Sequence, residues 1–129
     1  MPTPLVTQHY PHDFQIITLG LNTTGDGADQ AMFYADRTIV IDSVVVGTSV
    51  ADTGATCAVK YATSPVAATI ASGTAVTNTM DVSATGTVTA TIVTTANEIA
   101  AGNWIGLDFT AATDSLKGVV QIRFRSRVA

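Results

Sequence analysis

Charged residues are scarce in this chain and make up 12% of its 129 residues. Enzyme active sites and nucleic-acid-binding surfaces depend on clustered charged or titratable groups, and the sequence has few of them in any cluster. The net charge of −4 also disfavours binding to a phosphate backbone. The sequence therefore predicts a protein that is not an enzyme and that binds no nucleic acid.

Aromatic residues are scarcer still, at 6%, although hydrophobic residues reach 47%, so Ala, Val and Ile must fill the core. The one cysteine, Cys57, cannot form an internal disulfide, and its strand-like surroundings predict a small buried hydrophobic side chain. No apolar run approaches the roughly 18 residues of a membrane helix. The first five residues show neither the basic start nor the apolar stretch of a signal peptide. We expect no membrane partner and no targeting segment.

The first thirteen residues differ from the rest of the chain. Pro2, Pro4 and Pro11 exclude a helix and favour extended backbone. We predict an extended N-terminal arm over residues 1–13, followed by one domain over residues 14–129. Such an arm can add a strand to an exposed sheet edge, although disorder in the isolated chain is an equal alternative. The predicted contact residues of this region are Leu5, Val6, Tyr10 and Phe14.

Eight short strand patterns are separated by turn signals rich in Gly, Asn and Asp. No helical period lasts long enough for βαβ crossovers, so a parallel sheet is disfavoured. The spacing predicts an all-β fold, a single antiparallel β-sandwich with a jelly-roll-like layout. A break in alternation near Ser43 predicts a β-bulge, and residues 97–103 carry helix formers for a single turn. The predicted strands cover residues 14–21, 32–35, 38–46, 56–62, 75–80, 87–93, 104–109 and 119–125.

Two groups of residues are candidate metal sites. His9 and His12 flank Pro11 in the expected arm, where nothing holds them rigidly enough for metal binding or acid–base catalysis. Residues 25–29 are similar to a fragment of a calcium loop, but they offer two carboxylates where Ca²⁺ takes about six or more oxygens. An ordinary polar turn is the better interpretation, and we expect neither a metal nor a cofactor.

The last strand pattern places Arg123, Arg125 and Arg127 on one face at a period of two. This row has two main interpretations: a solvated outer face, or a cationic ridge that pairs with acidic groups on a neighbouring subunit. Nucleic-acid binding is a third and the least favoured, because no aromatic stacking platform accompanies the arginines. Trp104 alternates against Ile105, so we expect it on the outer face, either in a subunit contact or partly in the core. We predict Trp104, Arg123 and Arg125 as protein-contact residues.

The second half of the chain resembles one family. Residues 73–77, the Thr-rich strand after Gly86, residues 97–107 and residues 118–122 are similar to small β-sandwich head decoration, or cement, proteins of tailed bacteriophages. The resemblance covers roughly residues 30–126. It implies a homo-oligomer, with a trimer favoured, that binds the major capsid protein on the outer surface of the virion. It also implies that the arm runs along the shell.

These observations together predict a structural virion protein that stabilises a phage head by binding across capsid subunits. The alternative is a receptor- or glycan-binding β-sandwich module of a phage fibre or tail, which predicts a groove lined by Trp104, Tyr34 or Tyr61. A building block of the shell itself is a further alternative, although the chain is short for that role.

Overall fold

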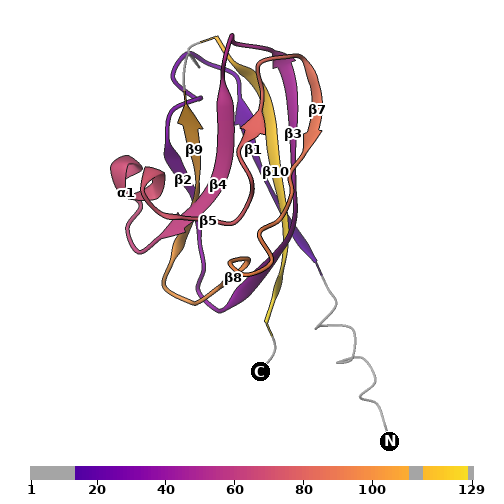
Figure 1. Cartoon of the computed structure of the whole chain (residues 1–129). Coiled ribbons are helices and arrows are strands. Elements are labelled where there is room, and N and C mark those ends of the chain that lie inside the picture. The colour runs from indigo at the N-terminus through magenta and orange to yellow at the C-terminus, as the bar shows by residue number, and fades with distance from the viewer. Residues whose placement is uncertain (1–13, 111–114, 128–129) are drawn as a thin grey trace, which may run out of the picture.

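The computed structural model describes residues 14–110 and 115–127. Within these ranges the chain forms ten strands and one short helix. The strands build two antiparallel sheets that stack face to face (Figure 1). The predicted all-β sandwich is therefore confirmed. The expected arm over residues 1–13, with Leu5, Val6, Tyr10 and both histidines, lies outside the described residues.

Each sheet has four strand positions. Sheet A has the order β1-β10-β3-β7, and β8 also pairs with β3; sheet B has the order β2-β9-β4-β5, and β6 also pairs with β4. The strands of sheet A are β1 (Gln15–Leu21), β3 (Ile39–Val50), β7 (Gly86–Thr89), β8 (Glu98–Ile99) and β10 (Lys117–Ser126). Sheet B and the helix comprise β2 (Gln30–Tyr34), β4 (Thr56–Ala62), β5 (Thr74–Ala75), β6 (Met80–Asp81), β9 (Trp104–Thr110) and α1 (Ala67–Ala71).

This strand order is that of a jelly roll. Successive positions alternate between the sheets except at the step from β4 to β5 and β6, which stays in sheet B, and the two pairs of short strands on β4 and on β3 each occupy one position. Counted in this way, ten strands fill the eight positions of two interleaved Greek keys. The prediction of about eight strands is confirmed in this sense, because sequence periodicity does not separate short strands that share one neighbour.

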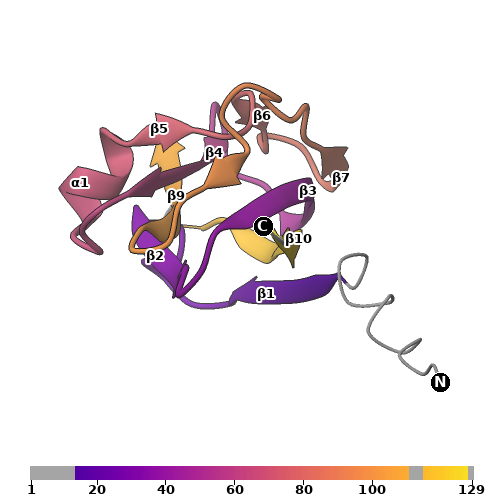
Figure 2. The ribbon, with the colours of Figure 1, turned by 90° about the horizontal axis from the view of Figure 1, so that it is seen from below.

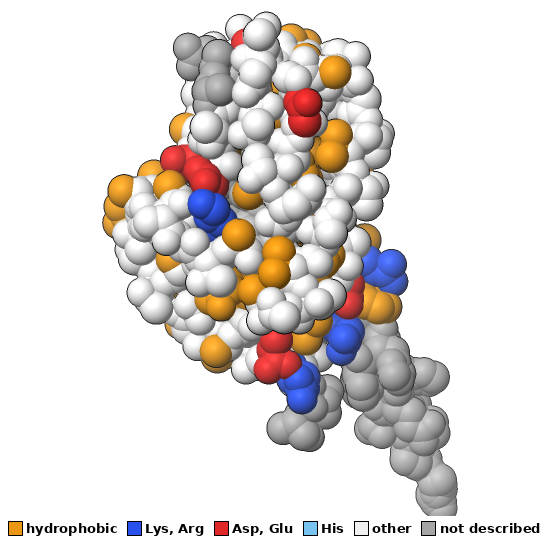
Figure 3. All heavy atoms as spheres, viewed as in Figure 1, with side chains coloured by type: hydrophobic (Ala, Val, Ile, Leu, Met, Phe, Trp, Pro, Cys, Tyr) orange, Lys and Arg blue, Asp and Glu red, His pale blue; other side chains and the backbone are white. Residues whose placement is uncertain are grey.

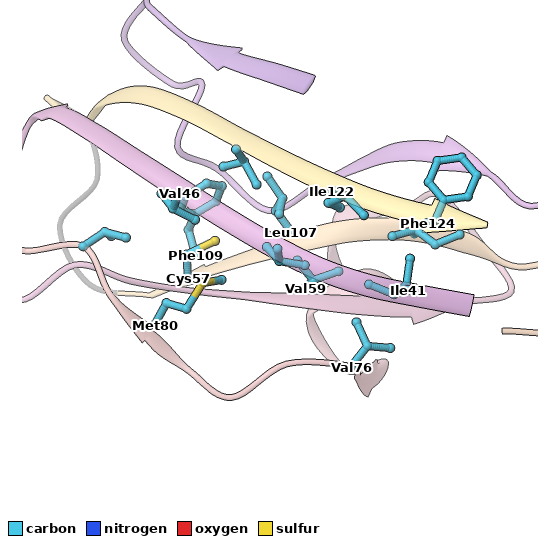
Figure 4. Packing of buried hydrophobic residues seen from close by; sticks show 14 of the residues in the cluster. Ile41, Val46, Cys57, Val59, Val76, Met80, Leu107, Phe109, Ile122 and Phe124 are labelled. Atoms are coloured by element: carbon cyan, nitrogen blue, oxygen red, sulfur yellow. The ribbon is translucent and has the colours of Figure 1, made fainter. Parts of the chain in front are cut away.

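The core lies between the two sheets and consists mainly of aliphatic side chains (Figure 4). Ile41 and Ile122 of sheet A and Val59 and Leu107 of sheet B are fully buried there. Phe33 and Phe124 stack across the core with ring centroids 5.0 Å apart. Cys57 is buried as predicted, and burial raises the pKa of its thiol to about 12. The side chain is therefore an uncharged thiol at neutral pH.

The predicted β-bulge near Ser43 is confirmed. In the ladder between β3 and β10, Arg123 pairs with Ser43 but Phe124 pairs with Ile41, so Asp42 is the extra residue. The bulge turns the side chain of Asp42 toward Arg125, 3.3 Å from its Nε.

Three predictions about local structure were wrong. Residues 97–103 form no helical turn, because Asn97 exchanges backbone and side-chain hydrogen bonds with Ile41 and ties this segment to β3. The strand predicted over residues 75–80 is interrupted at Thr77. Its side-chain hydroxyl, and not a backbone carbonyl, accepts a hydrogen bond from the backbone N–H of Val59. The strand predicted over 87–93 ends at Thr89. The helix α1 was not predicted.

Candidate interaction surface

The outer face of sheet B is covered. Helix α1 lies across β9 and β4 (Figures 1 and 2), and its one fully buried side chain is Ile70. Ile70 packs on Gly106, where an added Cβ would lie 2.9 Å from Ile70 Cγ2 and 2.4 Å from the carbonyl oxygen of Gln30. Only glycine fits under the helix at this position.

The charged side chain of Lys60 holds α1 against the same face. Lys60 Nζ lies 2.7 Å from Asp108 Oδ2 and donates a 2.7 Å hydrogen bond to the carbonyl oxygen of Ala71 at the end of α1. Asp29 accepts a 2.7 Å hydrogen bond from the backbone N–H of Phe109. Burial, reinforced by the neighbouring Asp108, raises the pKa of the Asp29 carboxyl. These side chains are engaged with one another and with the backbone, so we assign them to the fold.

The outer face of sheet A is uncovered. We call its central part the bare face and define it by the side chains of two adjacent rows that point away from the core over β1, β10, β3 and β7. They form two rows across the sheet, each with one residue from every strand. These residues are Gly20, Val119, Gly47 and Thr87 in one row, and Thr18, Gln121, Val45 and Thr89 in the next.

The bare face carries no charged side chain in these two rows. Val119 is 42% exposed, and Ile16, at the end of β1 beside the rows, is 57% exposed. An added Cβ on Gly47 would meet no atom within 4 Å. Small, uncharged side chains thus make a broad surface with no cover among the described residues. Figure 3, viewed as Figure 1, shows Lys and Arg side chains next to Asp and Glu side chains at several places, among mostly uncharged atoms.

The arginine row borders the bare face at one end. The guanidinium of Arg123 lies 3.6 Å from the ring centroid of Phe14, which is itself 43% exposed. Arg125 pairs with Asp42, and Arg127 pairs with Glu98. Two of the three arginines therefore have acidic partners within the same chain. The predicted pairing of Arg125 with a neighbouring subunit stays a prediction.

The predicted contact residues fall into two groups. Arg123 and Arg125 lie in β10 of sheet A and Phe14 directly precedes β1, whereas Trp104 belongs to β9 of sheet B. Trp104 is half-buried and points away from the core, and its ring centroid lies 4.9 Å from that of Tyr34. Phe14 is in contact with Arg123, and Trp104 is in contact with Tyr34.

A cleft of about 300 Å³ opens at the edge of the sandwich next to the arginine row. Its lining includes Gln15, Phe33, Tyr34 and Arg37. Of the residues expected to line a glycan-binding groove, Tyr34 lines this cleft, and Tyr61 lines a different hollow near α1. In this cleft the exposed ring of Tyr34 lies near the polar side chains of Gln15 and Arg37.

The carboxylates of the loop between β1 and β2 accept hydrogen bonds from backbone N–H groups. Asp26 accepts hydrogen bonds from the N–H groups of Asn22 and Thr23 at 2.8 and 2.9 Å and from the Thr23 hydroxyl. These bonds lower the pKa of the Asp26 carboxyl. The residues behave as the polar turn predicted from the sequence.

Sequence reasoning did not find the bare face. Its residues come from four strands separated by up to about a hundred positions, and their alignment depends on strand register. The only local signal was the alternation of threonines at 87, 89 and 91, whose side chains are exposed as expected.

No family model matches the chain, and no curated protein or solved structure shows significant similarity to it. The part of the chain that the structure describes contains no helix with the length and hydropathy of a membrane span.

Proposed function

We propose that this chain is a structural virion protein that decorates a phage head and stabilises it by binding across capsid subunits. The observation that carries the proposal is the contrast between the two outer faces. Sheet B is covered by α1 and fastened by Lys60, whereas the bare face of sheet A presents small, uncharged side chains. The resemblance to phage cement proteins supports the choice of partner, the major capsid protein.

The composition of the bare face suits a broad protein contact. The cores of protein interfaces are depleted in charged residues, and their rims are polar. Burying apolar area is worth about 25 cal/mol per Å², and threonine and glycine lose little side-chain entropy when they are covered. Phe14 and Arg123 stand at the border, where a rim is expected. A contact of this kind gains from repetition over many copies on one shell.

Binding to empty capsids tests this proposal. We expect the full-length protein to co-sediment with empty shells of the phage that encodes it and to raise the temperature at which the shells break open. No binding at micromolar protein, or binding without added heat resistance, would contradict the cement function.

Removal of residues 1–13 tests the predicted arm. We expect the chain that begins at Phe14 to fold and to lose affinity for the shells, because the contacts of Leu5, Val6 and Tyr10 are gone. Circular dichroism gives the control for folding. Full affinity of the shortened chain would remove the arm from the proposal.

The cleft favours a second candidate, a receptor- or glycan-binding module of a fibre or tail. Tyr34 is 49% exposed there beside Gln15 and Arg37, and sugars bind where an aromatic face meets polar groups. This candidate predicts binding on a glycan array that is lost in Tyr34→Ala. An array without signal would leave the decoration function as the sole proposal.

A further inference from the structure

Strand β1 is an unprotected sheet edge. It is the terminal strand of sheet A (Figure 2) and pairs on one side with β10 over all seven of its residues, without a register shift. It contains no charged residue and no proline. Natural edge strands are kept from pairing by charges, prolines, bulges or short length, and β1 has none of these devices.

The other sheet edges are protected. On sheet B, β2 has five residues and a register shift between Ala31 and Phe33. Opposite β2, the edge consists of β5 and β6, with two residues each. The far edge of sheet A is divided between β7 and β8. Among the described strands, β1 alone offers a long, regular edge.

We propose that β1 pairs antiparallel with β1 of a second copy of this chain, about a two-fold axis at Thr18. This register overlaps the two strands over their full length. It places Thr18 opposite Thr18 of the partner subunit, Ile16 opposite Gly20, and Ile17 opposite Leu19.

The side chains of β1 are self-complementary in this register. On the outer face, the exposed Ile16 meets Gly20, which has no side chain of its own, and only the end of the Asn22 side chain approaches that position. On the inner face, Ile17 and Leu19 are half-buried in the single copy, and each would cover the other. No like charges face each other, because the strand is uncharged.

The pairing closes on itself. A two-fold contact uses the same patch on both copies, so it ends at a dimer and does not grow into a fibre. It joins the two A sheets into one and places the two bare faces side by side. The inference does not depend on the proposed function, since it concerns the free protein. A two-fold dimer also differs from the trimer that the family resemblance implies, and the measured mass distinguishes them.

Charge at the axis gives the first test, by size-exclusion chromatography with light scattering of the full-length chain. Wild-type protein is expected as a dimer, whereas Thr18→Lys and Thr18→Glu should each be monomers, because like charges meet at the axis. An equimolar mixture of the two variants should recover the dimer. Thr89→Lys is the matched control, since Thr89 is also an exposed threonine of sheet A, and it should stay dimeric.

A wild-type monomer or trimer would overturn the inference, as would a Thr18→Lys protein with the mass of the wild type. Cross-linking is the second test. Thr18→Cys should form a covalent dimer on mild oxidation, because directly opposed residues of antiparallel strands lie within the reach of a disulfide. The buried Cys57 gives little background, and Thr89→Cys should remain uncross-linked. Equal cross-linking at the two positions, or none at Thr18, would also overturn it.

Discussion

The surroundings of Gly106 and Gly47 show that the outer faces of the two sheets differ in how closely they are packed. Each glycine lies in an inner strand with neighbours on both sides, Gly106 in β9 and Gly47 in β3. A Cβ on Gly106 would lie 2.4 Å from a backbone oxygen under α1, whereas a Cβ on Gly47 would meet nothing within 4 Å. The outer face of sheet B is therefore covered at Gly106, whereas the outer face of sheet A has room for a partner at Gly47.

The largest effect is expected at Gly106. Gly106→Ala forces the helix or β2 to shift, because the overlap is with backbone that cannot rotate away. Overpacking of this kind costs about 3 kcal/mol, measured as the free energy of unfolding in urea. A loss below about 1 kcal/mol would show that α1 is only loosely seated.

Lys60→Met should cost about 2 kcal/mol. Loss of one partner from a fully buried pair costs about 3–5 kcal/mol, and these side chains keep about a fifth of their surface exposed. Lys60→Arg is the control that keeps the positive charge. A Lys60→Met protein as stable as the wild type would mean that the pair does not hold α1 in place.

The cost of Lys60→Met should also depend on pH. The Asp29 carboxyl has a raised pKa, so its contribution to stability is full below its ordinary pKa of 3.8 and falls as pH rises through the folded value. Lys60 opposes this fall by favouring the carboxylate. The difference in unfolding free energy between variant and wild type should therefore be larger at about pH 7 than at about pH 3. An equal difference at both pH values would contradict the linkage.

Arg125→Ala should have a smaller effect, about 1 kcal/mol, because it leaves a buried oxygen of Asp42 without its cation. Arg127→Ala, at an exposed pair with Glu98, should cost less than about 0.5 kcal/mol. The order of the two losses in urea unfolding is the test. A larger loss for Arg127→Ala would mean that the pair of Arg127 with Glu98 stabilises the fold more than the pair of Arg125 with Asp42.

Gly47→Ala should have the smallest effect and the opposite sign. The site has room for a methyl group and its backbone is compatible with alanine, so the variant should gain up to about 0.5 kcal/mol through a less flexible unfolded chain. A marked loss of stability would show that the bare face is packed after all.

The sequence predicted the strands whose alternation is strict, such as residues 56–62 and 104–109, since each has one face in the core. The sequence-based prediction failed where the hydrogen bonds of a single side chain determine the local structure. Asn97 fixes its segment to β3, and Thr77 interrupts a strand with its hydroxyl. Helix α1 was missed because five residues with one buried side chain leave no periodicity. The bare face and the Lys60–Asp108 pair depend on register between distant strands, which local patterns do not contain.

Binding to empty shells by two matched variants tests most directly whether the bare face meets the capsid. Gly47→Arg places a charge in the middle of that face, and Thr74→Arg places the same charge on an exposed position of sheet B. Both should fold as the wild type does. We expect Gly47→Arg to lose co-sedimentation with the shells and Thr74→Arg to keep it. Retained binding by Gly47→Arg, or equal loss in both, would contradict a contact between the bare face and the capsid.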